Sequence, residues 1–176
     1  MEGLARRVVL TGSESTGKTT LTADLARHYE AIWVPEYVRG YADWKRAPLD
    51  AGDVEQIARG QLASQDLALE RAEKLLLMDT DLLSTVVYAE HYYGACPDWI
   101  RAAADHRRAD LYLLCDIDVP WTPDPQRDRS GDRRVMHDLF RSALARREFP
   151  FQMIHGGWRE RFLAARLAIE ELLAKS

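Results

Sequence analysis

The segment Leu10-Thr11-Gly12-Ser13-Glu14-Ser15-Thr16-Gly17-Lys18-Thr19-Thr20 contains the complete pattern G-x-x-x-x-G-K-T. In such a loop, two glycines let the backbone curl so that successive N–H groups point at an anion. The lysine places a positive charge on the outer phosphates, and the threonine hydroxyl can ligate Mg²⁺. The segment therefore predicts a mononucleotide site in which residues 12–20 bind ATP, Lys18 is catalytic and Thr19 binds the metal.

The sequence on both sides of this loop supports the prediction. Upstream, Arg7-Val8-Val9-Leu10-Thr11 is a short apolar and β-branched run, typical of a buried parallel strand. Downstream, Leu21, Leu25 and Tyr29 recur at i, i+4 and i+8, which predicts an amphipathic helix. The N-terminus of that helix would also favour phosphate. The alternative is a chance match in a glycine-containing turn, which this context disfavours.

Length and composition indicate one soluble domain covering residues 1–176. The net charge of -4 gives no general attraction to nucleic acid or to an anionic membrane. Cys96 and Cys115 lack a C-x-x-C spacing, so the sequence predicts neither a disulfide framework nor a zinc site. No apolar run approaches the ~18 residues of a membrane span or forms a signal sequence. We expect a cytoplasmic protein with a small-molecule substrate and no nucleic-acid or membrane partner.

Four further apolar runs predict strands, at residues 31–34, 74–79, 109–116 and 149–155. Between and after them, periodic stretches predict helices, including a long helix that starts with an Asp53/Gln56 capping box and runs to Glu73. Residues 44–50 lack periodicity and are expected to form a loop, a candidate flap over the site. Five strands alternating with helices imply an α/β fold of the P-loop NTPase type, with one parallel sheet covered on both faces.

The third predicted strand ends in Asp79-Thr80-Asp81. A buried central strand that delivers an aspartate at its carboxyl end is where nucleotide-binding α/β proteins place the Walker B carboxylate. Asp79 is therefore predicted to hold the Mg²⁺ shell or to take a proton. Asp81 has a second interpretation, as the N-cap of a helix that starts at Leu82.

Polar and aromatic residues follow the second predicted strand. Glu36, Tyr37, Arg39 and Tyr41 lie just beyond its carboxyl end, where open α/β sheets bind their ligands. Each of them could instead be a surface charge or a packed aromatic residue. A tyrosine group at residues 88, 92 and 93 likewise fits either core packing or stacking on a substrate ring.

The composition changes abruptly at residues 119–131, which contain almost no aliphatic side chains but include Pro120, Pro123, Pro125, Arg127, Arg129 and Gly131. Such a stretch cannot pack as core. A short lid at this position would close over the nucleotide, exclude water and bring guanidinium groups to the transferring phosphoryl. The alternative is an ordinary solvated loop. Size, lid and charge together favour a small-molecule kinase over motors, switches and helicases.

Four segments together resemble the ribosylnicotinamide kinase domain of the bacterial NadR family, over nearly the whole chain. They are the loop G-S-E-S-T-G-K-T-T, Pro35–Tyr41, Met78–Asp81 and Trp121–Arg129. Family members commonly carry a helix-turn-helix and a nucleotidyltransferase domain as well, which this sequence lacks, so only the stand-alone kinase is carried over. The resemblance implies ATP- and Mg²⁺-dependent phosphorylation of the ribose 5′-hydroxyl of nicotinamide riboside, giving nicotinamide mononucleotide.

The resemblance also implies roles for the residues at the strand ends. Lys18 and the loop amides would bind the β- and γ-phosphates, while Arg127 and Arg129 would stabilise charge during transfer. Glu36 and Asp81 would hold ribose hydroxyls and complement the cationic pyridinium.

Tyr37 and Arg39 would belong to the same substrate pocket. Where the family has an aromatic residue before Glu-Tyr, this chain has Pro35, and Trp33 and Trp44 are the candidates to substitute for it in stacking on the ring. The architecture places adenine near residues 155–158.

Two other functions fit the sequence. The first is a kinase for another nucleoside or small alcohol, which would differ in the pocket at residues 36–41. The second is a regulatory ATP-binding module that transfers no phosphate to a metabolite. The arginines at residues 127 and 129 argue against the second, because switches usually borrow that charge from a partner.

Overall fold

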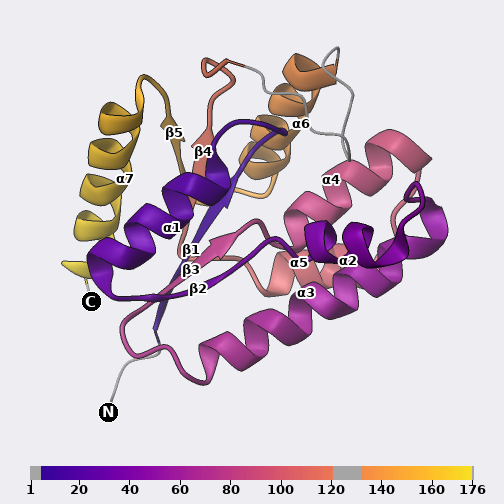
Figure 1. The fold of residues 1–176 in the computed structure, drawn as a ribbon, viewed down its shortest axis with the longest axis horizontal. Helices are drawn as coiled ribbons and strands as arrows, with labels where there is room; N and C mark the ends of the chain where they lie inside the picture. Colours follow the sequence, from indigo (N-terminus) through magenta and orange to yellow (C-terminus); the bar gives the residue numbers. More distant parts are fainter. Residues whose placement is uncertain (1–4, 121–131, 176) are drawn as a thin grey trace.

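A computed structural model describes residues 5–120 and 132–175 of the chain. Its five strands are β1 (Arg6–Thr11), β2 (Ile32–Val34), β3 (Leu75–Asp79), β4 (Leu111–Cys115) and β5 (Phe151–Ile154). All of them pair in parallel in one sheet of order β2-β3-β1-β4-β5 (Figure 1). This confirms the predicted α/β fold with a five-stranded parallel sheet. The order places β1, and the loop that follows it, between β3 and β4.

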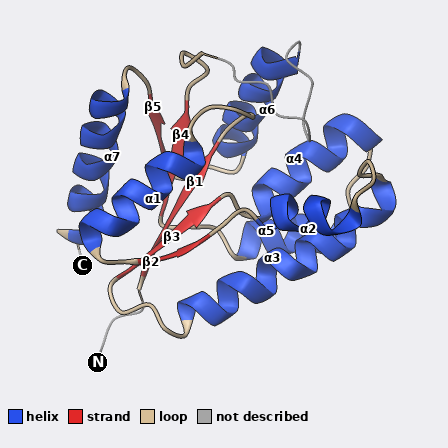
Figure 2. Ribbon diagram, viewed as in Figure 1, coloured by secondary structure: helices blue, strands red, loops and turns tan. Residues whose placement is uncertain are grey.

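Helices cover both faces of the sheet (Figure 2). One face carries α1 (Lys18–Tyr29) and α7 (Trp158–Leu173), and the other carries α3 (Val54–Leu69), α4 (Leu82–Tyr93) and α6 (Arg133–Arg146). Two shorter helices lie further out, α2 (Tyr37–Lys45) against α3 and α5 (Asp98–His106) against α4. A 3₁₀ turn (Ala51–Asp53) leads into α3.

The central strand shows why the apolar runs are continuous rather than alternating. Val9 packs into the core under α4 and α6, whereas Val8 and Leu10 pack into the core under α1 and α7. All three side chains are fully buried. A strand that is covered on both faces needs apolar residues at every position, so the β1 run of the sequence marks the middle of the sheet.

The predicted flap and capping box need correction. Trp44 and Lys45 belong to the end of α2, so the loop covers only residues 46–50. The capping box is formed by Asp50 with Asp53, and not by Asp53 with Gln56. The Asp53 carboxylate is already occupied, because it accepts hydrogen bonds from the Asp50 N–H group at 2.8 Å, from Lys45 and from the Tyr41 hydroxyl at 2.9 Å.

The long helix predicted at residues 53–73 is shorter than expected. It ends at Leu69, and turns connect it to β3. Most of the predicted lid, residues 121–131, lies outside the described residues, and with it Arg127 and Arg129. Among the helices of the described ranges, none combines the length and the apolar character that a bilayer crossing requires.

Candidate functional site

The loop between β1 and α1 has the backbone of an anion-binding turn. Gly12 and Gly17 adopt φ values of 128° and 80°, which residues with a side chain rarely do. A Cβ atom on Gly12 would lie 2.8 Å from the Cys115 carbonyl oxygen, and one on Gly17 would lie 2.4 Å from the Trp158 ring. Backbone conformation and close neighbours therefore both require glycine at these two positions of the motif.

Lys18 is buried at the first position of α1. Its Nζ donates to the Ser13 carbonyl oxygen at 2.6 Å, and the Thr16 hydroxyl donates to the same oxygen at 2.9 Å. Within the described part of the chain, the buried Ser13 hydroxyl has no hydrogen-bond partner. A buried ammonium group that reaches only neutral oxygens favours an anion beside it, because charge-assisted hydrogen bonds are stronger. The loop can therefore bind phosphate.

Thr19 and Asp79 form the neighbouring pair of oxygen ligands. The Thr19 hydroxyl donates to Oδ2 of Asp79 at 2.6 Å. Asp79 is 1% exposed and pairs in register with Leu10, so the carboxylate and the loop follow adjacent strands. Mg²⁺ in nucleotide sites usually takes one or two carboxylates together with phosphate oxygens and waters. This donor set fits Mg²⁺ beside a bound nucleotide.

A left-handed residue separates the two aspartates that follow β3. Thr80 has a φ of 66°, and its N–H donates to the Leu10 carbonyl oxygen at 3.0 Å. Because backbone conformations of this kind are costly for residues other than glycine, they concentrate at functional sites. The turn directs Asp79 towards the phosphate loop and leaves Asp81 to start α4.

Asp81 lies in the core rather than in a substrate pocket. Its carboxylate accepts hydrogen bonds from the Leu83 N–H group at 3.0 Å and from the Tyr112 hydroxyl at 2.8 Å. Burial raises the pKa of this carboxyl to about 6. The substrate-binding role expected for Asp81 does not fit this placement, whereas the alternative interpretation as a helix cap does. The physical reason is the left-handed backbone of Thr80, which ends the strand after Asp79 and lets Asp81 cap α4.

Two adjoining hollows meet at this edge of the sheet. The first is a trough of about 460 Å³ along the phosphate loop, whose lining residues are Glu14, Ser15, Thr16, Gly17, Lys18, Thr19, Thr20, Glu36, Arg39, Val119, Pro120 and Trp158. The second is a cavity of about 270 Å³ between α2, α3 and α4. Glu14 and Glu36 line both hollows. They mark the place where a phosphate donor and an acceptor would meet.

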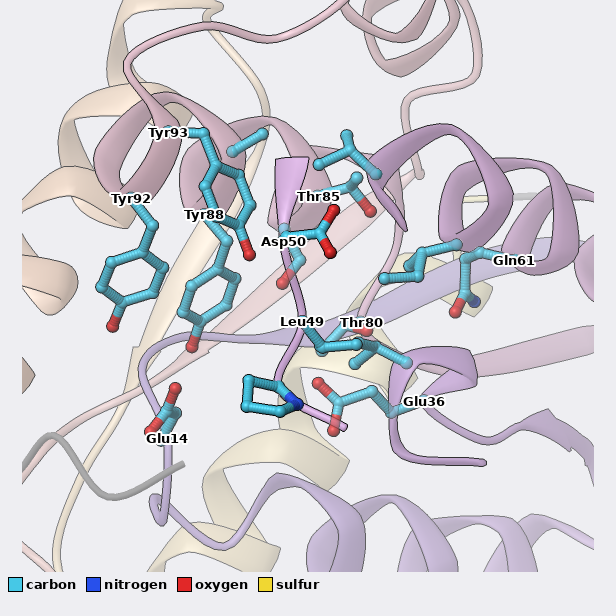
Figure 3. Close-up of a pocket in the computed structure, with 16 residues that line it drawn as sticks. Glu14, Glu36, Leu49, Asp50, Gln61, Thr80, Thr85, Tyr88, Tyr92 and Tyr93 are labelled. Atoms are coloured by element: carbon cyan, nitrogen blue, oxygen red, sulfur yellow. The ribbon is translucent and has the colours of Figure 1, made fainter. Parts of the chain in front are cut away.

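The smaller cavity, here called the acceptor cavity, combines aromatic rings with negative charge. Three of its residues are carboxylates (Glu14, Glu36 and Asp50), and three are the α4 tyrosines at positions 88, 92 and 93. Figure 3 shows the tyrosines along one side and Glu36 with Gln61 on the opposite side. None of the described residues that line this cavity is a lysine, arginine or histidine. Cations outside the lining face two of these carboxylates, since Lys45 Nζ lies 3.0 Å from Asp50 and Arg39 Nε lies 3.9 Å from Glu36. With acidic and aromatic groups on its own surface, the cavity suits a flat, positively charged group.

Glu36 lines the acceptor cavity, in keeping with the substrate-binding role predicted for it, whereas Arg39, predicted for the same role, lies outside that cavity. Glu36 is the N-cap residue of α2 and is 8% exposed, with Oε2 lying 3.9 Å from Nε of Arg39. Arg39 is half exposed and lines the trough, but it does not line the acceptor cavity. The structure thus places Arg39 on the nucleotide side of Glu36.

Tyr37 has a packing role. Its ring lies against α3, where a Cβ atom on Gly60 would come within 2.0 Å of it. Its N–H donates to Oε1 of Gln61 at 3.0 Å. Tyr37 joins α2 to α3 and does not line the acceptor cavity. Its expected place in the substrate pocket therefore does not fit this geometry.

Neither tryptophan proposed for ring stacking reaches the acceptor cavity. Trp33 packs against the core under α1, and Trp44 is 75% exposed on the outer side of α2, with its ring 5.6 Å from that of Tyr41. The rings that do line the cavity are those of Tyr88, Tyr92 and Tyr93. Both interpretations left open for this group fit the structure, because Tyr88 and Tyr92 also pack against the core under α4 and α6, Tyr88 edge-on against Phe140.

Two arginines of the site were not predicted from the sequence. Arg161 of α7 is fully buried and donates to the carbonyl oxygens of Thr16, Asp116 and Gly156 at 2.9–3.0 Å, and it pairs with Asp118. Arg133, the first residue of α6, donates to the carbonyl oxygens of Ser15 and Val119, both at 2.9 Å. No motif marks either arginine, because they enter from helices far along the chain.

Comparisons with known proteins identify the family and the fold of the chain. The model of a family described as an AAA domain matches residues 7–161. Two curated relatives, from Salmonella typhimurium strain LT2 and from Escherichia coli strain K12, are each named trifunctional NAD biosynthesis/regulator protein NadR. Each is 28% identical over 97% of this chain. The chain spans 43% of the length of these relatives.

Solved structures show the same fold. NadR in complex with NR superposes with a TM-score of 0.83 at 24% identity, over 97% of this chain and 51% of that one. NadR with NAD and AMP-PNP gives 0.81 at 25% identity, over 97% and 50%. Thymidylate kinase from Ehrlichia chaffeensis gives 0.73 at 15% identity, over 96% and 100%. The resemblance to NadR that the sequence motifs indicated is confirmed.

Proposed function

Because this chain belongs to the AAA domain family, whose model covers residues 7–161, we propose that it is a nucleotide-dependent kinase that phosphorylates the ribose 5′-hydroxyl of nicotinamide riboside. The NadR relatives and the neighbouring kinase structure support a phosphotransferase of this kind. The observation that carries the acceptor is the composition of the acceptor cavity, with three carboxylates, three tyrosines and no cationic side chain among its described residues. Nicotinamide riboside presents a flat ring with a permanent positive charge, which is the group that such a cavity attracts.

In the proposed reaction, Lys18 and the loop amides hold the phosphates of ATP in the trough. The acceptor oxygen forms a new bond to the γ-phosphorus, and the oxygen between the β- and γ-phosphates leaves with ADP. Phosphoryl transfer of this kind depends mainly on positioning and charge neutralisation. When bound, Mg²⁺ would neutralise charge on the phosphates, and Thr19 and Asp79 are the residues that would hold it.

Glu36 is the residue that we assign to the acceptor hydroxyl. It lines both hollows, which supports a position of its carboxylate near the point where the hydroxyl would meet the γ-phosphate. There it would accept a hydrogen bond from the reacting hydroxyl and take up its proton. Asp79, hydrogen-bonded to Thr19, is assigned to the metal shell. Mg²⁺ dependence, a cytoplasmic location and the charge-stabilising role of Arg127 and Arg129 stay predictions.

The experiment is a phosphorylation screen with labelled ATP and a panel of acceptors. Nicotinamide riboside, its neutral reduced form, uridine, cytidine, thymidine and thiamine would be compared at equal concentration. We expect nicotinamide riboside to have the highest kcat/KM, and Lys18→Ala to abolish its phosphorylation. Preferential phosphorylation of another nucleoside would show that this nucleoside, and not nicotinamide riboside, is the acceptor. ATP binding without transfer to any acceptor would favour a regulatory module.

A further inference from the structure

Arg133 and Arg161 come from helices on opposite faces of the sheet, yet they contact successive carbonyl groups of the phosphate loop, those of Ser15 and Thr16. Each also contacts the segment that follows β4: Arg133 at the Val119 carbonyl and Arg161 at Asp116 and Asp118. The two arginines therefore tie the loop to the same neighbouring segment. Their partners differ, however, and the difference indicates different roles.

Arg161 has a complete set of partners. Its Nε, Nη1 and Nη2 atoms all donate hydrogen bonds, and its charge is balanced by the Asp118 carboxylate. A fully buried guanidinium group is tolerated only with partners of this kind, and removing one of them would be strongly destabilising. Arg161 is thus a fixed connection between α7, the loop and the end of β4.

Arg133 has an incomplete set of partners. Both of its hydrogen bonds come from Nη2 and go to neutral carbonyl oxygens. Its Nε atom is buried without a hydrogen-bond partner, and no carboxylate within the described ranges forms an ion pair with it. Burial and the like charge of Arg161 lower the pKa of this guanidinium, and they outweigh the opposite effect of the Asp118 and Asp116 carboxylates, neither of which forms an ion pair with it. A half-buried cation with only neutral acceptors is the kind of group that an anion stabilises.

The anion available at this place is the phosphate chain of the nucleotide. The Ser15 carbonyl that Arg133 contacts belongs to the loop, and both Ser15 and Val119 line the trough. Lys18 is in a comparable situation, since its Nζ donates to the Ser13 carbonyl. A phosphate oxygen is a better acceptor than a carbonyl oxygen for either cation, and for guanidinium it can be bidentate.

We propose that Arg133 is a further nucleotide-binding residue, whose guanidinium exchanges the Ser15 and Val119 carbonyl oxygens for oxygens of the bound phosphate chain. This inference rests on the proposed nucleotide-dependent function, but it does not depend on the acceptor. It gives the start of α6, rather than residues 127 and 129 alone, a part in neutralising the phosphates.

The test measures nucleotide binding in the absence of any acceptor. Calorimetric titration of the whole protein with AMP-PNP and with ADP would be compared for the parent, Arg133→Ala, Arg133→Lys and the control Arg134→Ala. Arg134 is the adjacent arginine, exposed on the same turn of α6. Neither arginine lines the trough directly, but Arg133 donates to the Ser15 carbonyl of the loop, whereas Arg134 forms no hydrogen bond with the loop within the described part of the chain. Thermal unfolding of each variant without nucleotide is recorded in parallel.

We expect Arg133→Ala to bind AMP-PNP about 10- to 100-fold more weakly, the range of one or two charge-assisted hydrogen bonds. Arg133→Lys should recover part of this loss, and Arg134→Ala should bind AMP-PNP like the parent. The melting temperature of each variant should stay within about 3 °C of the parent, because water can replace the carbonyl contacts of Arg133. AMP-PNP and ADP affinities of Arg133→Ala within about threefold of the parent would overturn the inference. An equal loss of affinity in Arg134→Ala would also overturn it. The same holds if Arg133→Ala loses affinity together with a markedly lower melting temperature.

Failure of this inference can be told apart from failure of the proposed function. If the parent binds AMP-PNP and Arg133→Ala binds it equally well, only the role of Arg133 is wrong. If Arg133→Ala loses affinity but the parent phosphorylates no nicotinamide riboside, only the acceptor assignment is wrong. A parent that binds neither AMP-PNP nor ADP would overturn both.

Discussion

The hydroxyl of Thr19 donates a 2.6 Å hydrogen bond to Oδ2 of Asp79, although 60 residues separate them in the sequence. The contact joins the phosphate loop to the end of the adjacent strand, because β1 and β3 are neighbours in the sheet. It brings together the two oxygen groups that we propose would hold a nucleotide-bound Mg²⁺.

Asp79→Asn should therefore impair Mg²⁺ use more than ATP binding. We expect kcat to fall by at least about 10²-fold, since charge on the phosphates is less well neutralised in the transition state. The measurement is kcat as a function of Mg²⁺ concentration, with nucleotide affinity determined separately. A variant with parental kcat at low Mg²⁺ would contradict the assignment of Asp79 to the metal shell.

Lys18→Ala should abolish turnover while the fold is retained. Lys18 lines the trough and its Nζ lies 2.6 Å from the Ser13 carbonyl oxygen of the loop, so its charge would act on the transferring phosphoryl group. Steady-state kinetics and circular dichroism test the two parts of this prediction. Turnover within about tenfold of the parent would show that the loop has no catalytic role.

Glu36→Gln should reduce kcat/KM more for nicotinamide riboside than for its neutral reduced form. The Glu36 carboxylate lines the acceptor cavity, and a hydrogen bond to a charged group is worth roughly 1.5–3 kcal/mol, or about 10- to 150-fold. The KM for ATP should change little. Glu55→Gln, on the exposed side of α3, is the matched control. Equal losses on both acceptors would remove the charge argument and leave only a hydroxyl contact.

Gly60→Ala should destabilise the protein, whereas Gly40→Ala should not. Both glycines lie within helices, but a Cβ atom on Gly60 would meet the Tyr37 ring at 2.0 Å, while one on Gly40 has no neighbour within 4 Å. Overpacking costs typically about 1–3 kcal/mol, and an unhindered alanine in a helix gains about 0.5–1 kcal/mol over glycine. Urea unfolding of the two variants measures the contrast. Equal effects would mean that Tyr37 does not hold α2 against α3.

Asp53→Asn should remove a pH-dependent part of the stability. Burial opposes ionisation of Asp53, but hydrogen bonds from Lys45, the Asp50 N–H group and Tyr41 outweigh it, so the pKa of this carboxyl lies below its usual value. An acid with a depressed folded-state pKa stabilises the fold above its unfolded pKa of about 3.9 and loses this contribution as the pH falls through the folded value.

The free energy of unfolding of parent and Asp53→Asn should therefore differ most near pH 7 and converge below about pH 3. Urea titrations at several pH values test this. The control is Glu171→Gln, an exposed residue of α7, for which the difference should stay small throughout. If the parent and the Asp53→Asn variant differ by a constant amount from about pH 7 to about pH 3, the ionised carboxylate contributes nothing.

The sequence by itself determined the phosphate site and the sheet. The loop motif at residues 12–19 depends on local backbone geometry, which the glycines specify wherever they occur after a strand. The strands β1 and β3 are continuous apolar runs because both of their faces are buried, so their central position can be read from composition alone. The position of Asp79 could be predicted in the same way, because it is the residue at the carboxyl end of such a strand.

Only the tertiary structure decided which side chains share the acceptor cavity. Asp81 and Tyr37 have the residue types and positions of ligands, yet one turns inward to cap α4 and the other packs on Gly60. Conversely, no sequence motif includes the α4 tyrosines, Arg133 or Arg161. Local patterns specify backbone conformation, but the direction of a side chain at a strand end depends on a single turn, here the left-handed φ of Thr80. Contacts between helices far apart in the sequence depend on the packing of the whole sheet, which no local pattern records.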